Sequence, residues 1–457
     1  MTTETKDSGV KWIGTVPADW TLLKMKHCSY MKGRIGWQGL TADEFIEEGP
    51  YLVTGTDFER GRVCWDRSYH ISEKRYNEAV PIQLKVGDLL VTKDGTIGKL
   101  AYIDELPGKA SLNSHLLVIR PVGGKYINRF LYWVLGSSVF QGYYELVSYG
   151  STMDSLSQEK IGEFEFYAPP IDEQRAIAAF LDAECDKIDS IIDDLERQIE
   201  LLQQYRRMIV TETITKGLDD SVGYKDSGIP WYGKIPKHYE LKRLKYLLRQ
   251  NCVNMRVGPF GSALSADDIK SEGYWVYNQR CVLDENFEEN DSCVDAQKFA
   301  ELKTFRVYPG DLLITTRGTI GRIAIAPTNT PIGILHPCII RFVVDETLIT
   351  NELVKMIFND SNIVRDQLFM QSNATTIDVI YSYTLKNILL PVIPHKEQQR
   401  IIEFIKEKCT KIDGVLHDKE LQLEKAKAEK YALIYEYVTG KKTSKGGHEL
   451  CQLEPTS

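Results

Sequence analysis

A seven-residue repeat of apolar positions runs through the middle of the chain, with mostly charged and polar residues between its members. No glycine or proline interrupts residues 172–216, and Gly217 follows them directly. The pattern predicts one helix of about 45 residues, roughly 65 Å long at about 1.5 Å per residue. The members of the repeat are Leu181, Ile188, Leu195, Leu202 and Ile209.

A second apolar stripe of the same kind lies near the C-terminus. A helix this long with one apolar seam needs a partner helix, and the second stripe can supply it. Its seam is weaker, because Lys419 takes the place of Leu195. We expect Ile188 and Leu195 to pack near Ile412 and Leu416 in an antiparallel pair. The alternative is two separate amphipathic helices, each packed on its own domain. The second stripe contributes Ile405, Ile412, Leu416, Leu423 and Leu433 to the predicted helix-pair core.

The remaining regions, about 1–158 and 219–384, show mixed patterns. Short runs rich in β-branched and aliphatic residues lie between turn signals and predict strands. Longer stretches with helical spacing precede each long helix. The strand-like runs are 115–122, 312–316 and 338–344, and the helical stretches are 127–144 and 351–369.

The chain also repeats itself once. Three blocks recur in the same order, with offsets that grow slowly from 219 to 223 and 224. Such a pattern indicates a tandem duplication with small insertions. KDSGVKWIGTVP (6–17) recurs as KDSGIPWYGKIP (225–236), GDLLVTKDGTIG (87–98) as GDLLITTRGTIG (310–321), and PPIDEQRAI (169–177) as IPHKEQQRI (393–401).

The duplication predicts a division into two modules, two long helices and a polar tail. A chain of 457 residues has room for about two to four domains. Two similar but diverged modules most simply contact two similar but different targets. The predicted segments are 1–158 (first module), 159–218 (central helix), 219–384 (second module), 385–440 (C-terminal helix) and 441–457 (flexible tail).

The net charge of −8 is concentrated on one element. Residues 172–200 hold ten acidic and three basic residues, which accounts for seven of the eight negative charges. The modules are close to neutral and can carry local basic faces. The nine cysteines are scattered without a CxxC pair, which argues against a disulfide framework or zinc site and favours a reducing cytoplasm. We find no signal peptide and no stretch suited to a membrane span.

Catalytic signatures are almost absent from the sequence. No proline follows an asparagine and none precedes an aspartate, which excludes the usual motifs of amino-methyltransferases and of restriction-type nucleases. DGTIGK at 94–99 lacks the spacing of a phosphate loop, and Leu100 occupies the place of its hydroxyl residue. The eight histidines show no metal-ligand spacing. We therefore assign no catalytic and no metal-binding residues.

Candidate contact residues lie in loops that recur in both copies with changed polar side chains. Lysine, arginine, threonine and serine suit phosphate contacts, and arginine, asparagine and glutamine also suit base edges. For each loop, an ordinary hairpin turn or surface loop is the alternative. The first copy offers Lys32, Arg34, Trp37, Gln38, Thr56, Lys93, Thr96, Lys99, Ser151 and Thr152. The second copy offers Asn254, Arg256, Phe260, Ser262, Asn278, Gln279, Arg280, Thr316, Arg317, Thr319, Arg322, Ser372 and Asn373.

These motifs together resemble one known family. The DSGVKWIGTVP opening, the GDLLVTKDGTIG block and PPIDEQRAIAAFLDAECDKID before a long helix each occur twice and span nearly the whole chain. The sequence resembles the specificity subunit of type I restriction-modification systems. The resemblance implies an α+β fold with two similar mixed α/β target-recognition domains. Two long antiparallel, coiled-coil-like helices would separate them, related by an internal pseudo-two-fold repeat.

The resemblance also implies a function. Each domain would read one half of a split, asymmetric site on double-stranded DNA. Two methyltransferase subunits would bind along the helices, and two motor-nuclease subunits would join for cleavage. AdoMet, ATP and Mg²⁺ would then belong to these partners, and the chain itself would not be an enzyme. The alternatives are a stand-alone nuclease or methyltransferase with an unrecognised active site, or a coiled-coil scaffold, which leaves the two diverged modules unexplained.

Overall fold

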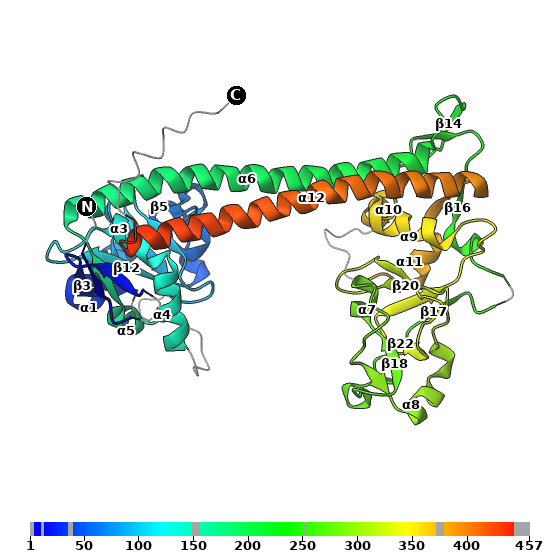
Figure 1. The fold of residues 1–457 in the computed structure, drawn as a ribbon, viewed down its shortest axis with the longest axis horizontal. Helices are drawn as coiled ribbons and strands as arrows, with labels where there is room; N and C mark the ends of the chain where they lie inside the picture. The colour runs from blue at the N-terminus through cyan, green and yellow to red at the C-terminus, as the bar shows by residue number, and fades with distance from the viewer. Residues whose placement is uncertain are drawn as a thin grey trace. The chain divides into compact units, whose positions relative to one another are not determined.

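The structure is a computed structural model of the chain. It describes residues 4–10, 13–34, 40–148, 156–250, 252–371 and 379–442. The chain forms two compact units that both contain helices and strands (Figure 1). Unit 1 consists of Met1–Leu195 with Leu421–Ser457, and unit 2 of Glu196–Glu420.

Unit 1 contains two sheets, three two-stranded ribbons and several short helices. Its strands are β1 (Thr5–Asp7), β2 (Thr15–Pro17), β3 (Thr21–Lys24), β4 (Ser29–Gly33), β5 (Ile46–Val53), β6 (Phe58–Glu59), β7 (Arg62–Val63), β8 (Tyr69–His70), β9 (Leu89–Thr92), β10 (Leu100–Tyr102), β11 (Ala110–Leu112), β12 (Leu116–Pro121) and β13 (Glu165–Ala168). Its helices are α1 (Met25–Cys28), α2 (Glu73–Glu78), α3 (Asn128–Leu135), α4 (Ser138–Ser148) and α5 (Gln158–Glu163), with the 3-10 turns η2 (Ala42–Glu44), η3 (Gly55–Asp57), η4 (Trp65–Arg67) and η5 (Val80–Ile82).

Unit 2 contains two sheets and two ribbons. Its strands are β14 (Tyr224–Asp226), β15 (Lys234–Pro236), β16 (Glu240–Arg243), β17 (Met255–Val257), β18 (Tyr274–Tyr277), β19 (Cys293–Val294), β20 (Leu312–Thr315), β21 (Ile323–Ile325), β22 (Gly333–Leu335), β23 (Ile339–Phe342) and β24 (Leu389–Val392). Its helices are α7 (Gln279–Leu283), α8 (Ala296–Glu301), α9 (Asn351–Asp360), α10 (Ile363–Gln371) and α11 (Ser382–Asn387), with the 3-10 turns η6 (Leu244–Tyr246), η7 (Ala266–Asp268) and η8 (Lys303–Phe305). The long helices α6 (Ile171–Lys216) and α12 (His395–Val438) belong to both units.

The two units share one arrangement of strands, which confirms the predicted duplication. In unit 1 the antiparallel order β10-β9-β12-β4 lies beside β11-β5-β8, where β11 and β5 are parallel. In unit 2 the order β21-β20-β23-β17 lies beside β19-β18-β22, where β18 and β22 are parallel. The predicted strands are β12, β20 and β23. Each predicted helical stretch is a pair of helices, α3 with α4 and α9 with α10.

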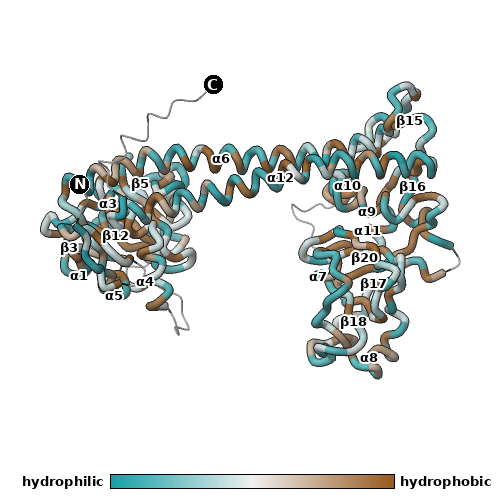
Figure 2. Tube along the Cα trace, viewed as in Figure 1, coloured by the Kyte–Doolittle hydropathy of each residue, from teal (hydrophilic) through white to brown (hydrophobic). Residues whose placement is uncertain are grey.

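The central strands are buried on both faces. Leu89 and Val91 of β9 point into the core that α3 covers, whereas Leu90 belongs to a second core on the opposite face. The same alternation holds for β20 in unit 2. This double burial explains why these strands read as continuous apolar runs instead of alternating ones. Figure 2 shows the hydrophobic stretches around β12 and β20.

The helix predicted at 172–216 is α6, which has 46 residues, and α12 has 44. Each ends before a glycine with positive φ, Gly217 at 76° and Gly440 at 69°, where other residues would be strained. The C-terminal half of α12 contributes Ile434 and Val438 to the main core of unit 1. The core of unit 2 likewise includes side chains from the C-terminal half of α6. Each core is thus completed by a helix from the other copy.

The two long helices run antiparallel in both units. In unit 1, Phe180 stacks on Tyr437 at 4.5 Å between ring centroids, and Asp189 lies 2.6 Å from Lys430 Nζ. Residue numbers therefore rise along α6 while they fall along α12. In unit 2, Arg206 Nε lies 2.8 Å from Asp413, and the later α6 residues Val210 and Ile214 share a core with the earlier α12 residues Ile401 and Ile405, so the direction is the same. The expected antiparallel direction is confirmed.

The predicted register of the helix pair is wrong. Ile188 precedes Asp189, which pairs with Lys430, whereas Ile412 precedes Asp413, which pairs with Arg206. Ile412 and Lys430 are about 27 Å apart along α12 at about 1.5 Å per residue, so Ile188 cannot pack on Ile412. Of the ten proposed seam residues, Leu181, Leu195, Ile405, Ile412 and Leu416 are buried, and Ile188, Leu202, Ile209, Leu423 and Leu433 are half-buried.

A buried glutamine fastens the start of each long helix to its unit. Gln174 is fully buried, and its Oε1 accepts from Ile127 N at 2.9 Å. Its Nε2 donates to Lys125 O at 3.0 Å and to Pro169 O at 2.8 Å. Gln398 makes the equivalent three bonds in unit 2. The recurring Glu-Gln pair of the sequence therefore marks a structural joint.

Replacing Gln174 with leucine is expected to lower the free energy of unfolding by about 2–4 kcal/mol, because one buried N–H and two buried carbonyls lose their partner. Urea unfolding followed by circular dichroism measures the change. Gln204→Leu is the control, because that side chain lies exposed on the same helix, where its Nε2 donates to Glu200 Oε1 at 3.1 Å. Equal effects of the two substitutions would contradict the role of Gln174.

An ion pair between a short helix and a long helix forms a second joint in each unit, and its charges are reversed between the two units. In unit 1, Arg129 of α3 pairs with Asp182 of α6, 2.9 Å away. In unit 2, Glu352 of α9 pairs with Lys406 of α12. The four residues occupy equivalent positions in the repeat, so the acidic partner lies on the long helix in one unit and on the short helix in the other.

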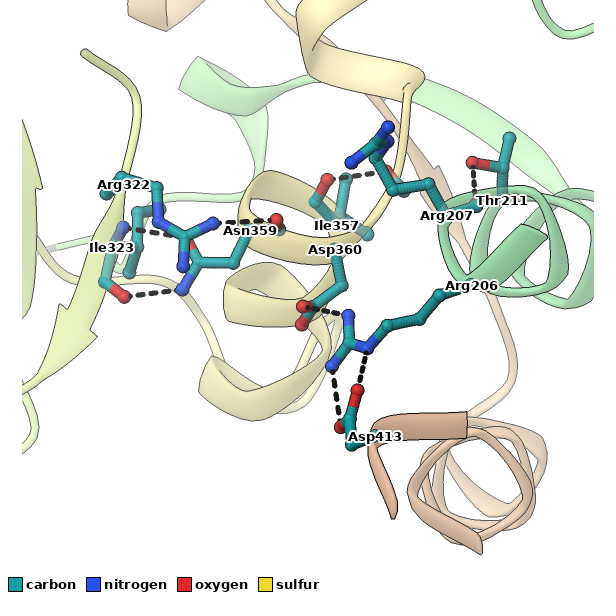
Figure 3. Close-up of polar contacts among 10 residues, drawn as sticks. Arg206, Arg207, Thr211, Arg322, Ile323, Ile357, Asn359, Asp360 and Asp413 are labelled. Carbon is teal, nitrogen blue, oxygen red and sulfur yellow. Dashed lines mark hydrogen bonds and ion pairs between the residues drawn. The ribbon is translucent and has the colours of Figure 1, made fainter. Parts of the chain in front are cut away.

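Arg206 ties three helices of unit 2 together (Figure 3). Its Nη1 lies 2.7 Å from Asp360 of α9, and its Nε lies 2.8 Å from Asp413 of α12. All three side chains come from regions that the sequence pattern separates widely.

Among the described residues, no helix has the length and hydropathy needed to cross a membrane.

Candidate nucleic-acid interface

The GDLL block of unit 1 leads into a braced turn, residues 93–99, between β9 and β10. The last residue of β9, Thr92, is buried beneath this turn. Its Oγ1 donates to Thr96 O at 2.5 Å and accepts from Lys99 N at 2.9 Å. One hydroxyl therefore holds both sides of the turn.

Unit 2 repeats the arrangement in residues 316–322, between β20 and β21. Thr315 is fully buried, and its Oγ1 donates to Thr319 O at 2.6 Å. It also accepts from Arg322 N at 3.1 Å. A hairpin turn, which the sequence analysis gave as an alternative for these loops, is confirmed as their backbone structure, but the two bracing threonines were missed. A threonine directly before both turns was the sequence signal that could have identified them.

The two turns share a backbone and differ in the side chains they present. Lys93 and Asp94 of the first turn occupy the positions of Thr316 and Arg317 in the second. Asp94 lies 3.3 Å from His115 Nδ1, whereas the Arg317 side chain is exposed and has no ion-pair partner among the described residues. One turn thus presents a carboxylate where the other presents a guanidinium.

Gln279 lies directly against the second turn. A Cβ added at Gly318 would come within 3.0 Å of its amide, and Gly318 has a φ of 65°. Glycine is therefore required there for both backbone conformation and space. The structure brings together Gln279, Arg317 and Thr319, three candidates that the sequence could only place in separate loops.

Two candidates are removed because their side chains are buried in the fold. Arg34 is 5% exposed, its Nε donates to Leu112 O at 2.8 Å, and its Nη2 to Ser111 Oγ at 3.0 Å. Burial, followed by the nearby Arg75, lowers the pKa of Arg34 to about 10. Thr316 is also buried and donates to Cys338 O at 2.8 Å. Neither can reach a nucleic acid while it keeps these bonds.

Asn278 has a structural role that competes with base contact. It caps α7, and its Oδ1 accepts from Cys281 N at 3.2 Å. Arg280, in the first turn of the same helix, is exposed and only loosely paired with Asp284 at 3.5 Å. Arg280 therefore stays a candidate, whereas Asn278 positions it.

A cavity of about 410 Å³ beside α7 is lined by Ser271, Asn278, Arg280, Cys281, Asn286, Glu289, Asn290 and Asp291.

Strand register corrects the alignment of the first loops. Arg256 faces Arg341 across β17 and β23, and Lys32 faces Val118 across β4 and β12. Arg341 and Val118 are equivalent, because they face the equivalent residues Leu313 of β20 and Leu90 of β9. Lys32, and not Arg34, is therefore the counterpart of Arg256. Arg256 is half-buried over the ring of Phe305, 5.8 Å from its centroid.

The other candidates differ in exposure. Phe260 is 88% exposed, and Thr56, Thr96, Lys99, Ser262 and Thr319 are exposed as well. Lys32, Lys93, Asn254 and Gln279 are half-buried, and Asn254 bonds Arg249 O. Arg322 is exposed, but its Nη1 donates to Asn359 O at 2.9 Å (Figure 3). Trp37, Gln38, Ser151, Thr152, Ser372 and Asn373 lie outside the described residues. Across the described ranges, no group of three or more His, Cys, Asp or Glu side chains could hold a metal ion.

Comparison with known proteins points to one family. The model of the type I restriction modification DNA specificity domain matches residues 38–201 and again 261–424. The chain is 22% identical over 441 residues to the putative type I restriction enzyme MjaX specificity subunit of Methanocaldococcus jannaschii, covering 94% of this chain and 95% of that protein. It is 24% identical over 341 residues to the type I restriction enzyme EcoBI specificity subunit of Escherichia coli, covering 72% of this chain and 68% of that one.

The fold agrees with the sequence matches. One chain of a solved structure on complex assembly and conformational transition of the type I R-M system superposes with a TM-score of 0.64 at 13% identity, over 93% of this chain and 99% of that one. Together these matches identify a non-catalytic, DNA sequence-recognition subunit and do not favour a stand-alone nuclease or methyltransferase. The chain belongs to the family of type I restriction-modification DNA specificity domains and carries two copies of that domain.

Proposed function

We propose that each unit reads one half of a bipartite, asymmetric DNA site, and that the braced turns carry part of this readout. The observation that supports the proposal is the pair of turns with one backbone and different side chains. Buried Thr92 and Thr315 hold the two turns alike, while Asp94 and Arg317 differ in charge at the same position. Two turns with the same backbone and different side chains suit two different half-sites.

Alanine at Arg317 is expected to weaken binding of the specific site by about 1–3 kcal/mol if the guanidinium contacts a base. The variant should then accept other bases at one position of one half-site. Methylation rates on a library of sites, measured with the partner methyltransferase at limiting enzyme, report both effects.

Lys234→Ala is the matched control for Arg317→Ala. Lys234 is an exposed cation of the same unit, on the β15 ribbon (Figure 2), and lies outside both turns. The control should keep wild-type rates on every site. If Arg317→Ala also keeps them, the second turn does not read DNA. A uniform loss over all sequences would instead assign Arg317 to the phosphate backbone.

The long helices are the proposed docking surface for the methyltransferase subunits, and they would set the spacing between half-sites. Leu201, Tyr205 and Met208 of α6 are spaced four and three residues apart, so they share one helix face. All three remain about half exposed in this chain. Exposed apolar surface of this kind is typical of a protein interaction site.

The proposed complex contains two methyltransferase subunits and, for cleavage, two motor-nuclease subunits. AdoMet, ATP and Mg²⁺ would be bound by these partners.

The cysteines of the described residues are all free, which favours a reducing cytoplasm as the place of action.

A further inference from the structure

A surface next to the second turn differs in charge from its counterpart in unit 1. The equivalence rests on backbone hydrogen bonds. Met25 N donates to Phe164 O in unit 1, and Leu244 N donates to Ile388 O in unit 2. The pair α1 and α5 therefore corresponds to the pair η6 and α11, which contact each other in unit 2. Figure 1 shows α11 near β16, the strand that leads into η6.

In unit 1 this surface is neutralised by glutamates. Lys24 Nζ lies 2.8 Å from Glu163 and 3.2 Å from Glu165. Lys26 Nζ lies 2.6 Å from Glu163. Hydrogen bonds from Lys24 and then from Lys26 lower the pKa of Glu163 to about 2, so it stays ionised at neutral pH. Both lysines are therefore engaged within the unit.

In unit 2 the cations remain but the carboxylates are gone. Arg243 and Lys245 occupy the places of the two lysines, whereas Asn387 and Leu389 replace the two glutamates. Arg243 Nη1 donates to the neutral Asn387 Oδ1 at 3.4 Å. Lys386 adds a third cation where unit 1 has a glycine. Among the described residues, no carboxylate forms an ion pair with any of these three cations.

Exposed tyrosines lie on the same two segments as these cations. Tyr246, Tyr381 and Tyr383 are 61%, 66% and 78% exposed. Lys245 Nζ lies 4.8 Å from the ring centroid of Tyr246. Arginine, lysine and tyrosine side chains all donate hydrogen bonds to phosphate oxygens, so this combination favours the backbone of a nucleic acid. We call Arg243, Lys245, Tyr246, Tyr381, Tyr383 and Lys386 the basic–aromatic surface.

The basic–aromatic surface is continuous with the second turn. Ile380 N donates to Thr316 O at 2.9 Å, and Arg317 forms an antiparallel bridge with Val379. Tyr381 follows directly in the chain. A duplex that lies on the turn is therefore close enough to extend its phosphate backbone over this surface.

We propose that the basic–aromatic surface is a second DNA-contacting surface, which holds the phosphate backbone irrespective of sequence and has no counterpart in unit 1. This inference rests on the proposed function, because it takes the second turn as a place where DNA lies. It makes the two units unequal: both read bases, but unit 2 also anchors the duplex.

The test is the salt dependence of DNA binding by the full chain in complex with its methyltransferase. The variant is Arg243→Gln with Lys245→Gln and Lys386→Gln. Each cation that neutralises a phosphate adds about 0.9 to the slope of log affinity against log salt, so three should remove up to about 2.7. Wild-type affinity should then fall about 40-fold more than variant affinity between about 50 and 200 mM salt.

Two further variants separate charge from folding. Asn387→Glu recreates the unit 1 arrangement without removing a cation, and it should also flatten the slope. Lys24→Gln with Glu165→Gln removes one cation and one carboxylate that pairs with it in unit 1, keeps the Lys26–Glu163 pair, and should leave the slope unchanged. Melting temperatures of all variants show whether each has folded.

The outcomes distinguish this inference from the proposed function. Flatter slopes with unchanged preference between specific and altered sites support it. An unchanged slope in the triple variant overturns it, as does a relaxed base preference, which would make the surface a reader of sequence. Loss of a co-purifying protein subunit with an unchanged slope would assign the surface to protein docking instead. If the wild-type complex shows no sequence preference, the proposed function fails, whatever the slopes are.

Discussion

Residues 1–217, produced with the partner methyltransferase, are expected to direct methylation to a palindrome built from the first half-site, with about the same spacer. The reason is the symmetry of the helix contacts. One ion pair recurs in both copies: Asp189 pairs with Lys430, and Asp413 pairs with Arg206. The two pairs are equivalent, because Asp189 matches Asp413 in the repeat and Arg206 matches Lys430. Two half-chains can form an Asp189–Arg206 contact twice about a two-fold axis, as homodimers commonly do.

The core of such a dimer is nearly complete. Ile434 and Val438, which fill the core of unit 1, would be replaced by Val210 and Ile214 of the second half-chain. One contact is missing, because Thr213 takes the place of the tyrosine that stacks on Phe180 in unit 1. Loss of this ring leaves a gap, so the dimer should form and be less stable than the full chain. Thr213→Tyr in the half-chain should raise its melting temperature.

Mapping of methylated bases in a genome that carries only the half-chain measures the outcome. The full chain, expressed in the same strain, is the control and should give the asymmetric site. Methylation of that original site, or of any other asymmetric site, by a folded half-chain dimer would refute the division into two equivalent modules.

Replacing Arg206 with alanine is expected to destabilise unit 2 by about 1–3 kcal/mol, because half-buried Asp360 and exposed Asp413 lose their cation at once. Burial lowers the pKa of Arg206, but its hydrogen bonds to Asp360 and Asp413 outweigh that effect and raise it. The guanidinium is therefore charged at every pH at which the protein folds. Without it, Asp360 of α9 and Asp413 of α12 remain near each other as like charges.

Hydrogen exchange locates this effect. Amides of α9 and of the adjoining part of α6 should exchange faster in Arg206→Ala, whereas those of α3 in unit 1 should keep their rates. Arg197→Ala on the same helix is the control, since that side chain is exposed. Uniform faster exchange in both units would show that Arg206 does not act locally, and unchanged exchange would show that it contributes nothing.

The sequence predicts the long elements well, because a heptad repeat over more than forty residues has few structural solutions. It predicts α6 to within one residue at its start, and the glycine stop after it. It could not predict the helix register, since an apolar repeat fits equally after a shift of seven residues. The register follows instead from specific polar contacts such as Asp189 with Lys430.

Candidate contact residues are harder to predict for a physical reason. Arginine in a glycine-rich loop looks the same whether it faces solvent or the interior. Arg34 is buried because Ser111 and Leu112, more than seventy positions away, satisfy its donors. The basic–aromatic surface was missed for the converse reason, since its members come from segments about 140 residues apart and only the fold brings them together.

The reversed polarity of the joint between the short and long helices limits which parts of the chain are interchangeable. A first module joined to α12 would bring Arg129 against Lys406, and a second module joined to α6 would bring Glu352 against Asp182. Both chimaeras place like charges in contact, whereas an exchange between chains at the same position keeps the opposite charges. Recombination can thus supply a new half-site at either position, but a module that moves from one position to the other meets a helix of the wrong charge.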